Sequence, residues 1–228
     1  MLALLQISIY TIVEYSIVLA ILWLLRDRID AALAAVFFGA LTTSQFLANK
    51  LVDFGVGVAP AGTDMFLISV AAVDAMAVFF GRAYALKAVR AGFLFQTIVA
   101  LSSWSTATLQ PPEWFAERAA VVDSVIAPSA RIAIASLTAY IVSYTVDVYI
   151  VTKWPRLHLL TRVYSSTLIS QVIDTVTFIT IAFGFDVEAV LGTLFVKWSL
   201  VPFEAVLIYG ARRYIRSIQN KDTKRFVQ

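Results

Sequence analysis

The stretch Ser165–Phe178, SSTLISQVIDTVTF, carries polar side chains inside a run that is otherwise apolar enough to cross a membrane. On a helix, Thr167, Gln171, Asp174 and Phe178 recur at intervals of three and four residues, so most of the polarity falls on one face. A carboxylate near the bilayer centre costs roughly 2.5–3.5 kcal/mol even on lenient insertion scales. The stretch therefore predicts a membrane-spanning helix whose polar face is compensated from inside the protein.

The composition places this helix in a polytopic membrane protein. Of the 228 residues, 60% are hydrophobic and 14% are charged, whereas a soluble domain of this size needs more charge to keep its surface solvated. Cysteine is absent and His158 is the single histidine. This excludes cysteine chemistry and argues against a histidine-built metal site or catalytic triad. We expect no metal, no cofactor and no enzymatic activity.

Apolar runs long enough to cross about 30 Å of hydrocarbon divide the chain into seven spans. They lie at 4–25, 31–54, 63–80, 86–108, 129–151, 163–184 and 189–210. The sequence predicts an all-α helical bundle that forms a single transmembrane domain over 1–228, with a basic tail at 211–228. The longest connection, 109–128, carries Trp114 beside charged residues and predicts an interfacial helix. That helix could be a lid over a site or a plain connector.

The basic residues predict the orientation of the bundle. Fourteen of the 18 lysines and arginines fall in alternate connections and in the C-terminal tail, all on one side. The positive-inside rule makes that side cytoplasmic, so the N-terminus faces outside and the C-terminus inside. We expect a multi-pass plasma-membrane protein whose tail contacts anionic lipid rather than nucleic acid.

Several ionisable and polar residues remain within the spans. At 1.5 Å per residue, Glu14, Asp74, Asp174 and Lys197 lie near mid-depth, while other polar groups lie nearer the outer end, among them Asn49 and Arg131. A further face in the fifth span carries Ser136, Tyr140, Ser143 and Asp147. Polar groups contributed by several spans favour a cavity open to the outside over a single charged helix pair.

Each of these residues also has a structural interpretation. Asp174 is either a ligand contact or a partner of Lys197 or of serines that holds helices together. Lys197 is either a ligand contact or a counter-ion, and Asp74 is either functional or structural. Asp147 is interpreted as an interfacial residue near a helix end, and Glu14 is assigned no role.

Two segments together resemble a known family. PSARIAIASLTAYIVSYTVDVYIV at 128–151 followed by SSTLISQVIDTVTFITIAF at 165–183 is similar to the paired signature of the queuosine-precursor transporter family, also called the vitamin uptake transporter family. The family pattern R-x-x-x-A-S with a later D-V is matched at Arg131, Ala135, Ser136, Asp147 and Val148. Its S-T segment followed by D-T-x-x-F is matched at Ser166, Thr167, Asp174, Thr175 and Phe178.

The chain departs from the family pattern in three respects. Val78 stands where the family usually has an acidic residue, Val73 stands where it often has Asn, and Pro202 lies closer to Lys197 than usual. The family typically has six spans, so residues 1–28 hold an additional N-terminal span. These departures leave the implied fold unchanged and bear on the identity of the substrate.

The resemblance implies uptake of 7-cyano- or 7-aminomethyl-7-deazaguanine, which are salvaged for tRNA modification. One carboxylate can accept two hydrogen bonds from a guanine-like edge, amides and hydroxyls can contact the other ring atoms, and aromatic rings can stack on the flat base. The expected substrate contacts are Asp174, Gln171, Ser170, Thr167, Asn49, Asp74, Arg131, Ser136, Tyr140 and Lys197. The chain has no Walker motif, so transport would draw on an ion gradient or a separate energising module. The oligomeric state is open.

A retinal-binding photoreceptor is the alternative from a different class, besides another small-molecule-binding membrane protein. Seven spans, an external N-terminus and a lysine in the last span, here Lys197 as the Schiff base, are also typical of that class. The third span, however, lacks the Arg and Asp arrangement of a counter-ion helix, and the two family-like segments would have no explanation.

Overall fold

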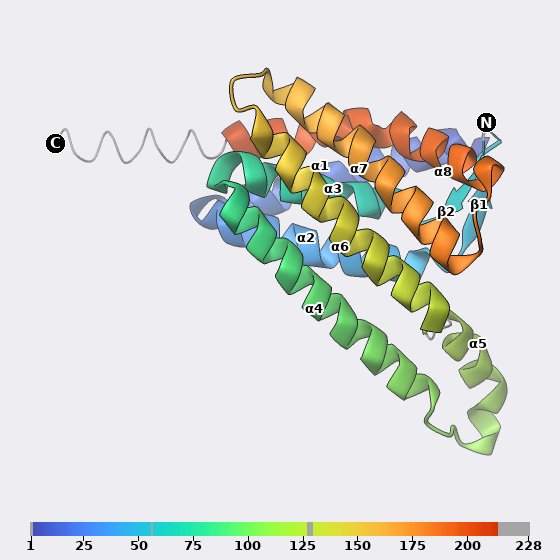
Figure 1. Ribbon diagram of the computed structural model, residues 1–228. Helices are drawn as coiled ribbons and strands as arrows, with labels where there is room; N and C mark the ends of the chain where they lie inside the picture. The colour runs from blue at the N-terminus through green and yellow to red at the C-terminus, as the bar shows by residue number, and fades with distance from the viewer. Residues whose placement is uncertain (1, 56, 127–129, 214–228) are drawn as a thin grey trace.

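The computed structural model describes residues 2–55, 57–126 and 130–213, which are almost entirely helical (Figure 1). The long helices are α1 Leu2–Leu24, α2 Ile29–Leu47, α3 Thr63–Phe80, α4 Arg82–Ala107, α6 Ala130–Lys153, α7 Leu159–Ala182 and α8 Val187–Leu200. Over these described ranges, seven helical segments are long and apolar enough to cross a membrane. The predicted all-α multi-span bundle is therefore confirmed. The orientation of the two ends stays a prediction from the basic residues.

The last span is interrupted by a proline. After α8 ends at Leu200, the chain makes a 3-10 turn, η3 (Val201–Phe203), and residues 204–213 are helical again. Pro202 lacks a backbone N–H and its ring clashes with the preceding turn, which explains the interruption. The break places Glu204 at the start of the second helical piece, where its side chain is fully buried.

The second span ends earlier than the sequence predicts. The run 31–54 reads as one span, but α2 ends at Leu47 and the chain forms an antiparallel hairpin of β1 (Leu51–Asp53) and β2 (Val58–Pro60). Asp53 supports the turn by accepting a hydrogen bond from the Gly55 N–H at 2.7 Å. Strand and turn signals over the ten residues Leu51–Pro60, which include Asp53, Gly55 and Gly57, thus outweigh the hydropathy of the run.

The hairpin packs on α8 at one end of the bundle (Figure 1). Gly57 and Gly192 touch backbone to backbone, where a Cβ on Gly57 would have no room. Thr193 adds a hydrogen bond from its hydroxyl to the Val58 carbonyl at 3.0 Å. These contacts hold the hairpin at the end of the bundle where the cavity described below opens.

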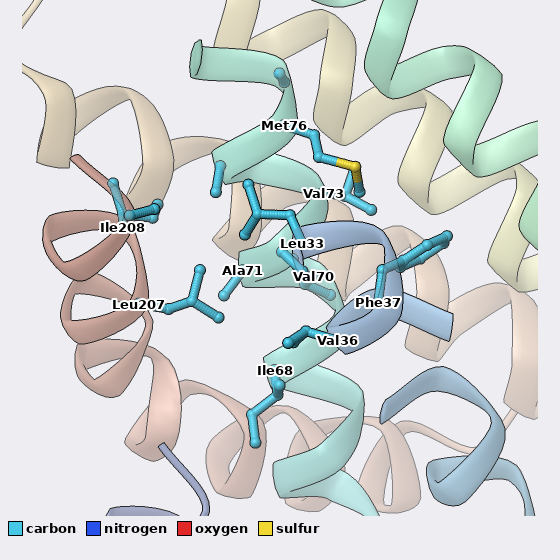
Figure 2. Close-up of a cluster of buried hydrophobic side chains, with 14 of the residues drawn as sticks. Leu33, Val36, Phe37, Ile68, Val70, Ala71, Val73, Met76, Leu207 and Ile208 are labelled. Carbon is cyan, nitrogen blue, oxygen red and sulfur yellow. The ribbon is translucent and has the colours of Figure 1, made fainter. Parts of the chain in front are cut away.

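The apolar core is built around α3, the most buried of the spans. Figure 2 shows side chains of α2, among them Leu33 and Phe37, against Ile68, Val73 and Met76 of α3, with residues of the last helical piece alongside. Alanines on α3 let the helix backbones approach closely. Because lipid is as apolar as the core, close packing rather than exclusion of water holds the helices together.

The connection 109–128 contains a helix, as predicted. It comprises η2 (Glu113–Phe115) and α5 (Ala116–Ile126), beside the far end of α4 (Figure 1). Trp114 is 84% exposed, and α5 has no buried residue. Val125 and Ile126, at the end of α5, line a smaller cavity beside the main one, so both the lid and the connector stay open for this helix.

Candidate functional site

A cavity of about 600 Å³ lies between the hairpin and the ends of several helices. Its volume falls within the range of small-molecule sites. Most of its wall is apolar, and the polar side chains that line it come from α2, α3, α6, α7, α8 and the segment before α8: Ser44, Gln45, Thr63, Ser136, Tyr140, Asp174, Thr175, Asp186, Thr193 and Lys197. The cavity therefore suits a small, largely apolar ligand held by a few polar contacts.

An ion pair stands in the wall of the cavity. The Lys197 ammonium donates to Asp174 Oδ2 at 2.8 Å and to Thr175 Oγ1 at 3.0 Å, and the Ser143 hydroxyl donates to Asp174 Oδ1 at 3.3 Å. The side chains of lysine and aspartate are 8% and 12% exposed. The ammonium also lies 4.7 Å from the centre of the Phe66 ring. The pair offers a ligand one acceptor and one donor side by side in a region of low polarity.

Aromatic rings line the same cavity. Phe66, Tyr140 and Phe178 all face it, on three different helices. The Tyr140 hydroxyl donates to the Val89 carbonyl at 2.6 Å, and Gly92 provides the space for that hydroxyl. Because the hydroxyl proton is engaged, Tyr140 can offer a ligand its ring and the acceptor side of its hydroxyl.

A smaller cavity of about 240 Å³ adjoins the first and shares Gln45, Ser136 and Tyr140 with it. Asn49 lines this second cavity, where its side-chain amide donates to the Phe46 carbonyl at 3.0 Å. The turn after α2 that carries Asn49 therefore borders the smaller cavity and not the ion pair.

Three hydroxyl side chains nearer the start of α7 lie deeper in the bundle, outside the cavity. Ser166 donates to Asp74 Oδ2 at 3.3 Å, Thr167 to Glu204 Oε2 at 2.8 Å and Ser170 to Asp147 Oδ1 at 3.0 Å. All six residues are buried. Consecutive turns of one helix thus hold carboxyls from three other segments of the chain.

The structure brings four of the predicted contacts together at the cavity: Asp174, Lys197, Ser136 and Tyr140. It places Thr167, Ser170, Gln171 and Asp74 in helix interfaces instead. These residues share a helical face or a mid-membrane depth with Asp174, but only one half of α7 borders the cavity, and the other half packs against α3, α6 and the last helical piece. Arg131 lies in α6, and its side chain is outside the described part of the structure.

Sequence reasoning missed several cavity residues. Gln45 is a polar side chain within a predicted span, and Thr175 follows Asp174 directly, so polarity alone could have indicated both. Phe66 and Thr193 gave no such signal, because an aromatic ring or a threonine within an apolar run is ordinary in a membrane helix.

The family model described as "Putative vitamin uptake transporter" matches residues 60–210. No curated protein and no solved structure gave a match. The matched region begins at the end of the hairpin and includes the ion pair, the aromatic wall from α3 onward and the buried carboxyls, while α1 and α2 precede it. It covers more than half of the chain and confirms the resemblance seen in the two sequence segments. The chain therefore belongs to this family of small-molecule uptake transporters, the queuosine-precursor transporter family, and is a multi-pass membrane protein.

Proposed function

We propose that this transporter imports a 7-deazaguanine, either 7-cyano-7-deazaguanine or 7-aminomethyl-7-deazaguanine, for salvage into modified tRNA bases. The observation that carries the proposal is the Asp174–Lys197 ion pair in the wall of a cavity that is also lined by aromatic rings. The family role of small-molecule uptake supports the transport step.

The ion pair complements a guanine-like edge. Such an edge presents a carbonyl oxygen beside a ring N–H and an exocyclic amine. A carboxylate has about four lone-pair sites, so Asp174 can accept from the two donors of the base while it keeps its bond to Lys197. Lys197 can in turn donate to the carbonyl oxygen. An adenine edge presents a donor where guanine has its carbonyl, and it would set that donor against the ammonium.

The aromatic wall complements the faces of the base. Phe66, Tyr140 and Phe178 come from α3, α6 and α7 and can sandwich or flank a planar bicycle, and base–aromatic stacking contributes about 1–3 kcal/mol per base. Gln45, Ser136 and Thr193 line the remaining wall and can contact the substituent at position 7. Asn49 and Arg131 remain proposals for the entrance to the site.

Ligand-induced thermal stabilisation of the purified protein tests the substrate. A ligand that binds only the folded state raises the unfolding midpoint with concentration. Across a panel of the two 7-deazaguanines, guanine and adenine, we expect the largest shift with a 7-deazaguanine and the smallest with adenine. A flat response from a folded sample would refute the substrate assignment and leave the family role intact.

The retinal photoreceptor is not retained as a candidate. The family match includes the span that carries Lys197 and describes a transporter. An intramembrane enzyme is likewise not proposed, because membership of a transporter family implies binding and translocation rather than bond-making.

A further inference from the structure

Three carboxyls from different segments meet beneath the cavity. Asp74 of α3, Asp147 of α6 and Glu204 of the last helical piece are each at most 1% exposed. The Asp74 carboxyl lies within hydrogen-bonding reach of the other two. We call these three residues the carboxyl cluster. It lies one to two turns of α7 from Asp174, toward the N-terminal end of that helix.

Each carboxyl of the cluster receives one hydroxyl donor from α7 and keeps one oxygen without a donor. The oxygens without a donor, among the residues that the structure describes, are Asp74 Oδ1, Asp147 Oδ2 and Glu204 Oε1. Buried oxygens without partners are rare and costly, and three uncompensated negative charges in a membrane interior would cost far more. The arrangement therefore lacks donors or positive charge.

Among the residues that the structure describes, no cation forms an ion pair with the cluster. The described residues form two ion pairs, Arg28–Asp30 and Lys197–Asp174, and neither includes the cluster. The titratable groups that face the cluster are tyrosines, Tyr144 of α6 toward Asp147, and Tyr15 of α1 and Tyr164 of α7 toward Glu204. A further acidic pair, Glu14 and Asp64, lies beyond Tyr15. These described titratable neighbours are all neutral or acidic.

The space beside Asp147 excludes a larger ligand. The void beside Asp147, Ser170 and Gln171 has no room for a water molecule. The described residues also hold no group of three acidic or histidine side chains placed to coordinate a metal ion. A proton needs no cavity, and one proton between two carboxyls supplies the missing donor, as in the paired aspartates of aspartic proteases.

A polar connection joins the cluster to the substrate cavity. Ser143, one turn from Asp147 on α6, donates to Asp174 at the cavity wall. Ser143, Asp147, Ser170 and Gln171 line the same small void. Gln171 is 1% exposed, and neither its side-chain nitrogen nor its oxygen has a hydrogen-bond partner in the described structure. An amide with free hydrogen-bonding groups at this point can rotate toward either the cluster or Asp174.

We propose that the carboxyl cluster of Asp74, Asp147 and Glu204 is the proton-binding site that couples uptake to a proton gradient. The proton arrives from one side of the membrane, binds a carboxyl oxygen that has no donor and is shared with the neighbouring carboxyl. It then leaves that oxygen toward the other side of the membrane. Only O–H bonds form and break. A change at Asp174 on substrate binding reaches the cluster through Ser143 and Gln171. The inference rests on the proposed import activity for its transport experiment only.

Infrared difference titration of the purified protein tests proton binding without any substrate. We expect a carboxylic-acid C=O band that titrates with pH in the wild type and that weakens in both Asp147→Asn and Glu204→Gln. Two variants are used because either one alone could misfold, and each is checked by its unfolding midpoint. Glu117→Gln, an exposed carboxyl on α5, is the matched control and should leave the band unchanged. A band that is absent, or that is insensitive to both cluster variants, overturns the proposal.

Uptake into proteoliposomes under a pH gradient tests whether transport is coupled to protons. The probe is labelled 7-cyano-7-deazaguanine. One proton per substrate gives about tenfold accumulation per pH unit, whereas a sodium gradient at equal pH should give none. We expect Glu204→Gln to lose the pH-driven accumulation while it continues to exchange labelled for unlabelled substrate, and Glu117→Gln to accumulate as the wild type does. Accumulation driven by sodium, or independent of both gradients, overturns the proposal. If the probe is not transported at all, the substrate assignment fails, and the infrared titration still decides on the proton site.

Discussion

Replacement of Asp174 by Asn tests whether Asp174 contacts the substrate or only forms a structural ion pair with Lys197. In the structure the carboxylate does both jobs at once, because it lines the cavity and accepts from the Lys197 ammonium at 2.8 Å. Asparagine keeps the shape of the side chain, removes the charge, and turns one acceptor into a donor. Both the folding stability and the affinity should therefore fall, by amounts that can be worked out separately.

The loss of stability follows from the broken ion pair. Removing one partner of a buried pair costs about 3–5 kcal/mol. We expect about 3 kcal/mol for Asp174→Asn, because the cavity leaves the Lys197 side chain 8% exposed and so offers its charge some water. The loss of affinity follows from the charged hydrogen bonds to the base. These contribute about 1.5–3 kcal/mol, or roughly a 10- to 150-fold increase in Kd.

The assay measures the unfolding midpoint without ligand and the Kd for 7-cyano-7-deazaguanine by calorimetry on the folded fraction. Asp186→Asn is the matched control. Asp186 also lines the cavity but caps α8, accepting from the N–H groups of Glu188 and Ala189 at 2.9 and 3.2 Å. Because asparagine caps a helix as well as aspartate does, this variant should keep both quantities near the wild type.

The double variant Asp174→Asn/Lys197→Met completes the test. Removing the orphaned ammonium should restore much of the stability lost in Asp174→Asn, while the affinity stays low. An unchanged affinity of the folded Asp174→Asn protein would show that Asp174 only stabilises the packing of the helices and does not contact the substrate. A double variant less stable than Asp174→Asn would refute the argument from the ion pair.

Three further predictions use other parts of the structure. Reporter fusions should place the N-terminus outside and the C-terminus in the cytoplasm, and both ends on one side would contradict the interpretation of the basic residues. Gly57→Ala should lower the unfolding free energy by about 1–3 kcal/mol, because its Cβ would overlap the backbone of α8. Gly39→Ala, with open space around the glycine, should not destabilise the protein. Equal unfolding midpoints for the two variants would exclude a tight contact between the hairpin and α8. Thr167→Val should lower the unfolding free energy by about 1–3 kcal/mol, because it leaves a buried oxygen of Glu204 without its donor. Thr145→Val should lower it less, because the Thr145 hydroxyl donates to a carbonyl of its own helix. The reverse order would argue against the pairing of Thr167 with Glu204.

The class of the protein and most of its spans follow from the sequence alone. Hydropathy is a local property of about twenty consecutive residues, so a run such as 163–184 identifies its span without knowledge of its neighbours. The same holds for the polar stretch on α7 and for the two segments that indicate the family. Hydropathy failed where a local signal of another kind competed with it, as at the hairpin of Leu51–Pro60.

Only the tertiary structure decided which polar residues share a site. Thr167, Gln171 and Asp174 lie on one face of one helix, and the sequence offers no means to divide them. The packing of α3, α6 and the last helical piece against one half of α7 buries the first two and leaves Asp174 at the cavity. The meeting of Asp74, Asp147 and Glu204 depends on contacts between residues 57 to 130 positions apart. Such contacts are set by how whole helices pack, and periodicity within each helix says nothing about them.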